Sequence, residues 1–185
     1  MEPVAAAFEA VPRAGFLPAR ARRRASYDGP IPIGEGQTNS QPRTVEAMLE
    51  LLDVRRGQHV LDVGAGSGWT TALLAHLTGP TGRVRGVELV PSITAWGQRN
   101  LEGAAKPWAS IEPAEPGVLG LPRHAPYDCI LVSAEPATLP DELVAQLADG
   151  GRMVIPVSGV MLLVVKRSDD VDVTRHGYYR FVPLK

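Results

Sequence analysis

The stretch from His59 to Gly68 constrains the fold of this chain more than any other. A short apolar run at 59–63 ends in three alternate glycines, Gly64, Gly66 and Gly68, and then changes to helical periodicity. Glycine lets the backbone turn sharply and lets a ligand approach the main chain closely. Glu88 follows about twenty residues later, at the end of the next apolar run, where it can accept hydrogen bonds from a ribose diol. This layout predicts a nucleotide-type cofactor site on an open parallel sheet.

From residue 57 onward, apolar runs alternate with helical patterns. The alternation predicts right-handed βαβ units and an α/β fold, with a mostly parallel, doubly wound sheet that carries helices on both faces. The expected strands are 59–63, 84–88, 109–112, 127–132 and 152–156. The expected helices between them are 68–78, 92–104 and 140–147.

The C-terminal strands are expected to run in the opposite direction. Only three residues separate Pro156 from the apolar run 160–166, whereas a parallel crossover needs about a dozen. The runs 160–166 and 177–183 should therefore join the sheet antiparallel, as hairpins, with Asp169 and Asp170 in the turn between them.

Proline and glycine break up the N-terminal quarter of the chain. The expected elements are a short helix at 2–10, an irregular covering segment at 11–18 and a loop at 27–36. Ser40 is a candidate N-cap for the helical pattern that begins near Pro42. The arginines between 20 and 24 form either a solvated face or a patch that attracts an anionic substrate.

Composition narrows the class of protein. A net charge of −1 over 185 residues gives no basic field of the kind that nucleic-acid binders carry. The single cysteine, Cys129, cannot form an internal disulfide, and its apolar neighbours predict a buried thiol in a reducing compartment. No apolar run approaches the roughly 18 residues of a membrane helix, and the N-terminus lacks a signal-peptide pattern. We expect a cytoplasmic, single-domain protein without nucleic-acid or membrane partners.

The spacing within the glycine loop indicates which cofactor it binds. Gly64-x-Gly66-x-Gly68 is shorter than the G-x-G-x-x-G of a dinucleotide site, and Asp62 would repel a pyrophosphate. The same carboxylate suits a cationic ligand, such as the amino and sulfonium groups of S-adenosylmethionine. A tight strand-to-helix turn without a ligand is the simpler interpretation, but it does not account for Asp62, the three glycines and Glu88 together.

Residues 60–68 resemble motif I of class I S-adenosylmethionine-dependent methyltransferases, whose fold is Rossmann-like. Further blocks stand in the order found in protein-L-isoaspartate O-methyltransferases, at 11–13, 36–42, 119–122, 150–157 and 181–184. The block Gly-Gln-Thr-x-Ser-Gln-Pro at 36–42 is specific, because general methyltransferases lack it. The resemblance covers the chain from about Phe8 to its last residue.

The resemblance implies an enzyme that methylates the α-carboxylate of L-isoaspartyl residues in damaged proteins and peptides. It implies S-adenosylmethionine as cofactor, S-adenosylhomocysteine as product and no metal. Ser40 would be the catalytic residue, and Thr38 and Asn39 would bind substrate. Residues 1–56 would be a covering segment carrying the acceptor-site loop, and residues 57–185 the cofactor-binding core of one compact domain. The implied cofactor-binding residues are Asp62, Gly64, Ala65, Gly66, Ser67, Gly68, Glu88, Leu89, Glu115 and Gly117.

Three departures from the family pattern bear on the acceptor and on adenine. Asn39 stands where the family has an aliphatic residue, Pro116 where it has an acid that contacts adenine, and Glu135 adds a charge after the fourth strand. The departures at Asn39 and Glu135 leave open a carboxyl O-methyltransferase for a dedicated peptide or small-molecule acid. A nucleic-acid amino-methyltransferase and a cofactor-binding module without catalysis also remain open. We expect a monomer.

Overall fold

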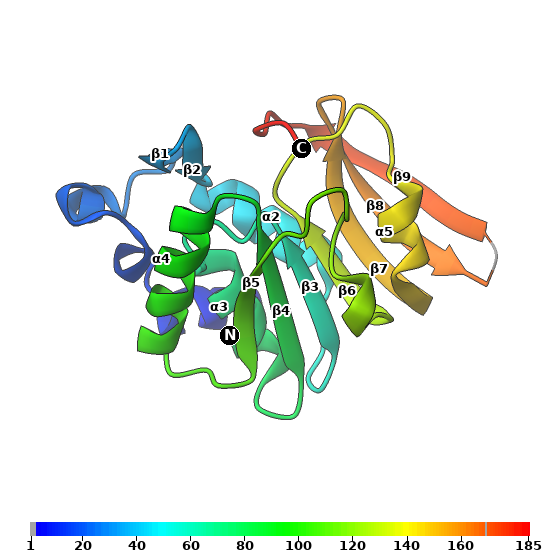
Figure 1. The fold of residues 1–185 in the computed structure, drawn as a ribbon, viewed down its shortest axis with the longest axis horizontal. Coiled ribbons are helices and arrows are strands. Elements are labelled where there is room, and N and C mark those ends of the chain that lie inside the picture. Colours follow the sequence, from blue (N-terminus) through cyan, green and yellow to red (C-terminus); the bar gives the residue numbers. More distant parts are fainter. Residues whose placement is uncertain (1–2, 169) are drawn as a thin grey trace.

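The computed structural model describes residues 3–168 and 170–185. A seven-stranded sheet forms its centre (Figure 1). In spatial order the strands are β5 (Ala109–Pro113), β4 (Arg83–Glu88), β3 (His59–Val63), β6 (Tyr127–Val132), β7 (Leu147–Val157), β8 (Val160–Arg167) and β9 (Asp170–Tyr178). A separate antiparallel pair joins β1 (Ile31–Gly34) to β2 (Gln37–Asn39).

The strands from β5 to β7 run parallel, and β8 and β9 join them antiparallel as hairpins. The predicted mostly parallel sheet with antiparallel C-terminal strands is confirmed. The chain lays β4 and β5 on one side of β3 and then returns to place β6 on the other side. Open α/β sheets bind ligands at the carboxyl ends of their strands, where the strand order reverses in this way. A ligand site is therefore expected beyond the ends of β3 and β6.

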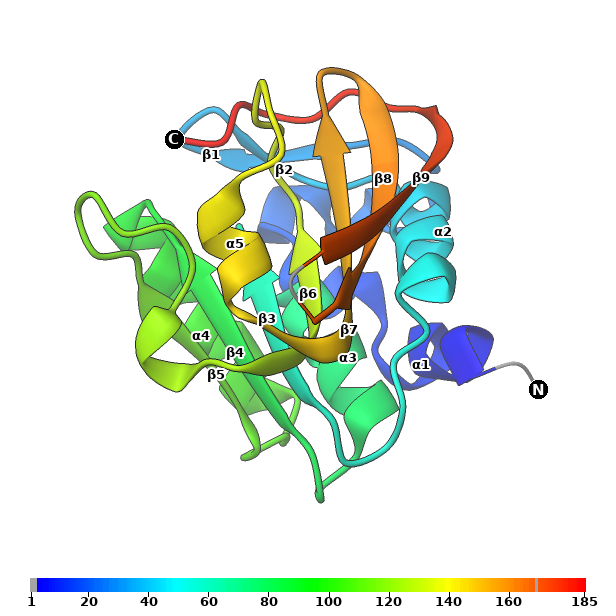
Figure 2. The same ribbon diagram turned by 90° about the vertical axis from the view of Figure 1, so that its right-hand side faces the viewer.

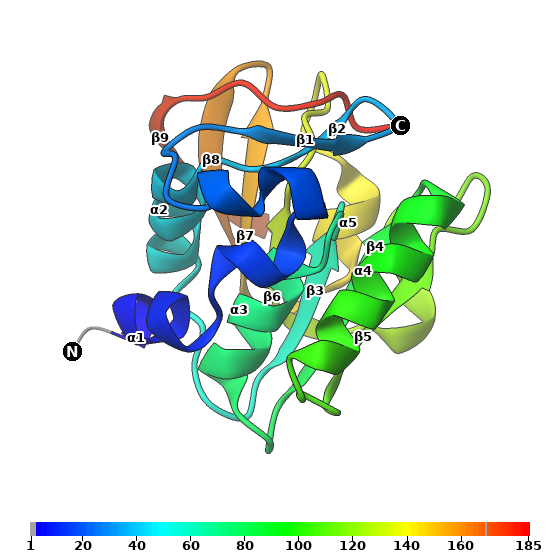
Figure 3. The ribbon, with the colours of Figure 1, turned by 90° about the vertical axis from the view of Figure 1, so that its left-hand side faces the viewer.

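Helices cover the two faces of the sheet unequally (Figures 2 and 3). One buried cluster packs the sheet against residues of α1, α2, α3 and α4, and the cluster on the opposite face contains Leu143 of α5. Among the described residues, α5 is the one α-helix on this second face. The helical elements are α1 (Pro3–Ala10), η1 (Arg13–Phe16), η2 (Ala19–Arg24), α2 (Pro42–Leu52), α3 (Trp69–Thr78), α4 (Pro91–Gly103), η3 (Pro122–His124) and α5 (Asp141–Ala145), where η marks a 3-10 helix.

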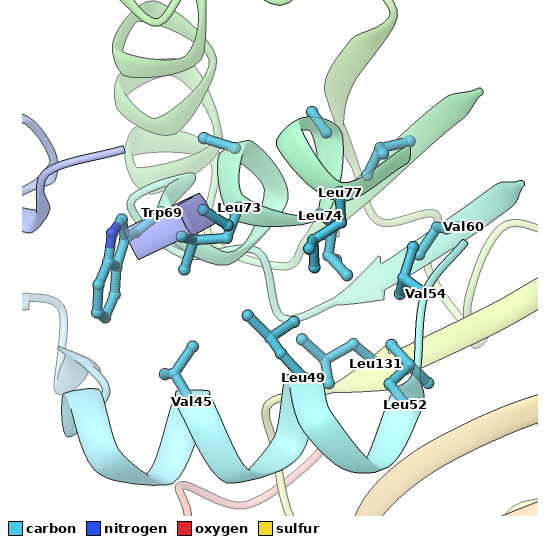
Figure 4. Packing of buried hydrophobic residues seen from close by; sticks show 14 of the residues in the cluster. Val45, Leu49, Leu52, Val54, Val60, Trp69, Leu73, Leu74, Leu77 and Leu131 are labelled. Atoms are coloured by element: carbon cyan, nitrogen blue, oxygen red, sulfur yellow. The ribbon is translucent and has the colours of Figure 1, made fainter. Parts of the chain in front are cut away.

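The packing between α2 and α3 explains why these segments are helical. Four apolar residues of α2 recur at helical spacing and are buried: Val45, Met48, Leu49 and Leu52. In Figure 4 the side chains of Val45 and Leu49 point toward Trp69 and Leu73 of α3. Helix α3 packs on β3, β4 and β5 and also contacts α1 and α4, so nearly all of its residues are buried. The burial of α2 also fixes where the preceding residues, 37–41, enter the molecule.

The position of the C-terminal strand differs from the prediction. The structure has β9 at Asp170–Tyr178, whereas the apolar run at 177–183 predicted a strand there. Most residues of β9 are exposed at the edge of the sheet, so its pattern is polar and no apolar run marks it. Asp170 begins this strand instead of lying in a turn, and Asp169 lies outside the described residues.

Two other elements differ from expectation. The helix predicted at 140–147 spans only Asp141–Ala145, because β7 already begins at Leu147. The loop predicted at 27–36 contains β1, which pairs with β2 to form a short ribbon. The signal for this ribbon is weak, because its strands are only four and three residues long.

The N-terminal segment follows its predicted course with one correction. A short helix and an irregular covering segment precede η2, whose arginines are exposed, in agreement with a solvated face. The N-cap of α2 is Gln41, so the capping role predicted for Ser40 is wrong. Within residues 3–168 and 170–185, no helix combines the length and the apolar character needed to cross a bilayer.

Candidate active site

A cavity of about 970 Å³ opens beyond the carboxyl ends of β3, β4 and β6. Its walls include the loop after each of these strands, the segment around β2, and the chain from Tyr178 to the C-terminus. A cavity of this size accommodates a drug-sized ligand. The predicted site residues that line it are Thr38, Asn39, Ser40, Gly64, Ala65, Gly66, Ser67, Glu88 and Leu89.

The glycine loop forms a tight turn because its glycines adopt left-handed backbone angles. The φ angles are 80° at Gly64 and 54° at Gly66, a region that other residues rarely adopt. The backbone N–H groups of Gly64 and Ala65 both donate to the carbonyl of Val87, at 2.9 and 3.1 Å. These bonds hold the loop against the end of β4, next to Glu88.

The carboxylate of Glu88 is buried and held by two backbone amides. Its Oε2 accepts from the N–H of Gly66 at 2.9 Å, and its Oε1 accepts from the N–H of Val90 at 3.0 Å. A carboxylate has about four lone-pair positions, so both oxygens can still accept from a ligand. The position and free acceptors of Glu88 fit the predicted role of binding a ribose diol.

Asp62 lies behind the glycine loop and does not line the cavity. Its Oδ2 accepts from the hydroxyls of Thr70 and Thr71, both at 2.7 Å, while Oδ1 is buried without a partner among the described residues. Burial raises the pKa of Asp62 to about 6, the two hydroxyls oppose this shift, and the charge of Glu88 adds to it. A ligand in the cavity would not contact this carboxylate, because Asp62 is fully buried and outside the lining. A cationic ligand on the other side of the loop would still offset part of the cost of its buried charge.

Helix α4 packs directly on the glycine loop, a contact that the sequence did not reveal. A Cβ atom on Gly97 would lie 2.4 Å from the carbonyl oxygen of Gly66. From the same helix, Asn100 donates to the carbonyl of Ser67 at 2.9 Å. A glycine inside a helical pattern indicates close packing, and this was the available signal for Gly97.

Arg13 organises the segment that carries Ser40, and the sequence patterns did not predict this role. Its buried guanidinium donates to the carbonyls of Tyr27, Gly29, Asn39 and Ser40 at 2.8 to 3.1 Å, and to Asn39 Oδ1 at 2.6 Å. Burial lowers the pKa of Arg13 to about 10, so it stays a cation at neutral pH. The block at 11–13 marked Arg13 as part of the family pattern, but which groups its guanidinium binds depends on the tertiary fold.

The residues of the acceptor segment, 37–41, differ in exposure. Thr38 is exposed and Ser40 is half-buried, and both line the cavity. Asn39 is buried, and its side chain contacts Arg13 and Ser67. Both ends of its amide are therefore bonded to other residues of the site, although Asn39 also lines the cavity.

Two residues expected near adenine lie elsewhere. Glu115 and Gly117 do not line the cavity, and Glu115 forms an exposed ion pair with Arg123. The apolar side chains of Leu89, Val118 and Leu119 line the wall instead. Gly68 is also outside the lining, where it forms the N-cap of α3.

The C-terminal segment closes the cavity opposite the acceptor segment. The backbone N–H of Glu135 donates to the carbonyl of Val182 at 2.8 Å, and the N–H of Leu184 donates to the carbonyl of Glu135 at 3.0 Å. The carboxylate of Glu135 accepts from the N–H of Phe181 at 3.3 Å, and the residue does not line the cavity. The charge at Glu135 thus serves to hold this segment.

Comparisons with known proteins indicate one family. The model of the protein-L-isoaspartate(D-aspartate) O-methyltransferase family matches residues 1–185. A protein-L-isoaspartate O-methyltransferase from Methanothrix thermoacetophila is 44% identical over 185 residues, which are 99% of this chain and 88% of that protein. One from Methanopyrus kandleri is 44% identical over 186 residues, covering 98% of this chain and 82% of that protein.

Solved structures agree in fold. A protein-L-isoaspartate O-methyltransferase superposes with a TM-score of 0.90 at 26% identity, covering 100% of this chain and 62% of that chain. A putative enzyme of the same name from Plasmodium falciparum, in complex with S-adenosyl-L-homocysteine, has a TM-score of 0.89 at 24% identity, covering 100% of this chain and 91% of that chain. The family match spans the whole sequence and the relatives exceed 40% identity, so this chain belongs to the protein-L-isoaspartate(D-aspartate) O-methyltransferase family.

Proposed function

We propose that this chain repairs damaged proteins by transferring a methyl group from S-adenosylmethionine to the carboxylate of an L-isoaspartyl residue. The observation that carries the proposal is the one cavity that Ser40, the glycine loop and Glu88 line together. The family match gives the reaction type, and the cavity brings together the residues proposed for cofactor and acceptor.

The proposed cofactor contacts follow from the acceptors that the loop presents. Glu88 would bind the ribose hydroxyls, and the backbone of residues 64–67 would lie along the amino-acid part of the cofactor. Leu89, Val118 and Leu119 would pack against adenine. When bound, the cofactor supplies an electrophilic methyl group on a sulfonium sulfur.

The reaction requires the protein mainly to align the acceptor carboxylate with the methyl group of the cofactor. A carboxylate with a reference pKa of about 4 is ionised at neutral pH, so its oxygen can attack a methyl carbon without a general base. The site must hold that oxygen in line with the methyl–sulfur bond and exclude water. We assign Ser40 to this task, with its hydroxyl donating to the other carboxylate oxygen and Thr38 beside it. The electron pair of the broken bond stays on sulfur, and a methyl ester results.

A radiolabelled methyl-transfer assay tests the proposal. An isoaspartyl peptide should accept label as a base-labile ester, and the same peptide with normal aspartate should accept far less. Equal labelling of both peptides, or no labelling of either, would contradict it. Labelling of a small carboxylic acid in preference to both peptides would indicate a dedicated acceptor instead of general repair.

We further propose that the enzyme is a cytoplasmic monomer, with residues 1–56 serving the acceptor and 57–185 the cofactor. Three of the five large apolar side chains that are exposed in the described residues line the cavity: Leu89, Val118 and Tyr178. Exposed apolar surface is thus concentrated at a ligand site, which supports a monomer more than a subunit interface. The buried thiol of Cys129 suits a reducing compartment. Light scattering during gel filtration would test the monomer.

A further inference from the structure

Asn39 joins two parts of the site that are distant in the sequence. Its Nδ2 donates to the hydroxyl oxygen of Ser67 at 3.0 Å, and its Oδ1 accepts from Nε of Arg13 at 2.6 Å. A guanidinium can only donate, so the amide oxygen must face Arg13 and the amide nitrogen must face Ser67. The orientation of this side chain is therefore fixed by its partners.

The link is shielded from water at all three residues. Arg13 is 6% exposed, Asn39 is 4% exposed and Ser67 is 3% exposed. Buried hydrogen bonds of this kind are not exchanged for bonds to water, so they hold their partners rigidly. Each end also carries part of the proposed site. Ser67 follows Gly66, which is bound to Glu88, and Asn39 precedes Ser40.

We propose that Asn39 is a positioning residue that couples cofactor binding at the glycine loop to the placement of Ser40. The proposal rests on the proposed function, in which Glu88 binds the cofactor and Ser40 holds the acceptor. A cofactor that orders the loop around Gly66 and Ser67 orders the acceptor segment through this one side chain. By linkage, an acceptor that orders residues 37–41 strengthens cofactor binding by the same factor.

A double-mutant cycle tests the coupling in the full-length protein. Asn39→Leu and Ser67→Ala each remove the same hydrogen bond, from opposite sides. We expect each to lower kcat at saturating substrates by ~10-fold, and the double variant to lose no more than the larger single effect. Asn39→Asp keeps acceptors for both Arg13 and the Ser67 hydroxyl, so it should retain more activity than Asn39→Leu.

Asn100→Ala provides the matched comparison. It releases Ser67 from the α4 side without touching Asn39, so its effect should add to that of Asn39→Leu. Additive effects of Asn39→Leu and Ser67→Ala, or a kcat of Ser67→Ala within about twofold of wild type, would overturn the proposal. If Asn39→Leu does not fold, Ser67→Ala and Asn39→Asp still decide it.

Hydrogen exchange gives a readout that needs no acceptor. S-adenosylhomocysteine should slow amide exchange at residues 37–41 of the wild type and not of Ser67→Ala, although both bind it. Slowing in both proteins would refute the coupling. This result is independent of the proposed function, which fails separately if the wild type does not label an isoaspartyl peptide.

Discussion

Asp62 and Glu88 are both buried carboxylates, and their surroundings give them different properties. Glu88 accepts from two backbone amides, which stabilise its charge where a ligand can reach it. Asp62 has two hydroxyl donors on one oxygen and, among the described residues, none on the other. Its position behind the loop makes it part of the support for the cavity wall.

Ser40→Ala tests the proposed acceptor contact at the scale of one hydroxyl. Loss of a hydrogen-bond donor to a reacting carboxylate should lower kcat by ~100-fold, while the affinity for S-adenosylhomocysteine changes little. Steady-state kinetics with an isoaspartyl peptide and calorimetry with S-adenosylhomocysteine measure the two effects. Ser26→Ala, at an exposed serine between η2 and β1 that does not line the cavity, should behave as wild type. Unchanged turnover in Ser40→Ala would remove Ser40 from the mechanism.

Asp62→Asn should change how stability depends on pH. The folded pKa of Asp62, about 6, is above its unfolded value, so between about pH 4 and 6 the folded state binds more protons. The free energy of unfolding of the wild type should therefore fall, relative to Asp62→Asn, by roughly 3 kcal/mol as pH rises through this window. Urea denaturation at several pH values measures the difference. A difference that is constant from about pH 4 to 7 would contradict the raised pKa.

At the scale of elements, the contact between α4 and the glycine loop decides the shape of the cofactor site. Because Gly97 has no side chain, α4 can approach the loop closely enough for Asn100 to bind Ser67. The loop is thus fixed from three sides, by β4, by α4 and by the acceptor segment.

Gly97→Ala should disrupt this contact. The added methyl group would overlap the carbonyl of Gly66, so we expect a loss of stability of about 1–3 kcal/mol and weaker cofactor binding. Gly103→Ala is the matched control in the same helix, because its Cβ would meet no atom within 4 Å. It should be neutral or stabilising by up to about 1 kcal/mol. Thermal melts with and without S-adenosylhomocysteine compare the two variants. Equal melting temperatures for Gly97→Ala and Gly103→Ala would show that α4 does not pack tightly on the loop.

At the scale of the whole molecule, the cavity is closed by two segments from outside the parallel strands. Residues 37–44 and 178–185 reach its walls from opposite parts of the sequence. Neither segment belongs to the β3–β6 crevice, so they can set acceptor choice while the strand ends hold the cofactor.

Removal of residues 179–185 should impair use of the acceptor without impairing cofactor binding. The backbone bonds that join Glu135 to Val182 and Leu184 would be lost, and with them one wall of the acceptor end. We expect kcat/KM for an isoaspartyl peptide to fall by at least ~10-fold, with S-adenosylhomocysteine binding retained. Deletion of Lys185 alone keeps these bonds and removes only the last of the lining residues, so it should lower kcat/KM far less. A truncated protein with wild-type kcat/KM would show that this wall does not bind the acceptor.

The sequence predicted the parallel strands well and the antiparallel edge strand β9 poorly. The run at 59–63 coincides with β3, and that at 127–132 coincides with β6, because buried parallel strands are continuously apolar. The strand β9 was misplaced because its exposed residues are polar and its position depends on pairing with β8. Among the site residues too, local spacing was informative and contacts between separate segments were not. Glu88 followed from its distance to the glycine loop, whereas Glu115 pairs with Arg123, a contact made across a turn.

The sequence by itself determined the fold class and the family, because both depend on local patterns: an apolar run, alternate glycines, an acid at fixed distance and the block at 36–42. Only the tertiary structure decided that Asp62 lies behind the cavity wall and that Arg13 and Asn39 join the acceptor segment to Ser67. Those contacts link residues far apart in the chain, and no periodicity or spacing specifies which distant polar groups a buried side chain will meet.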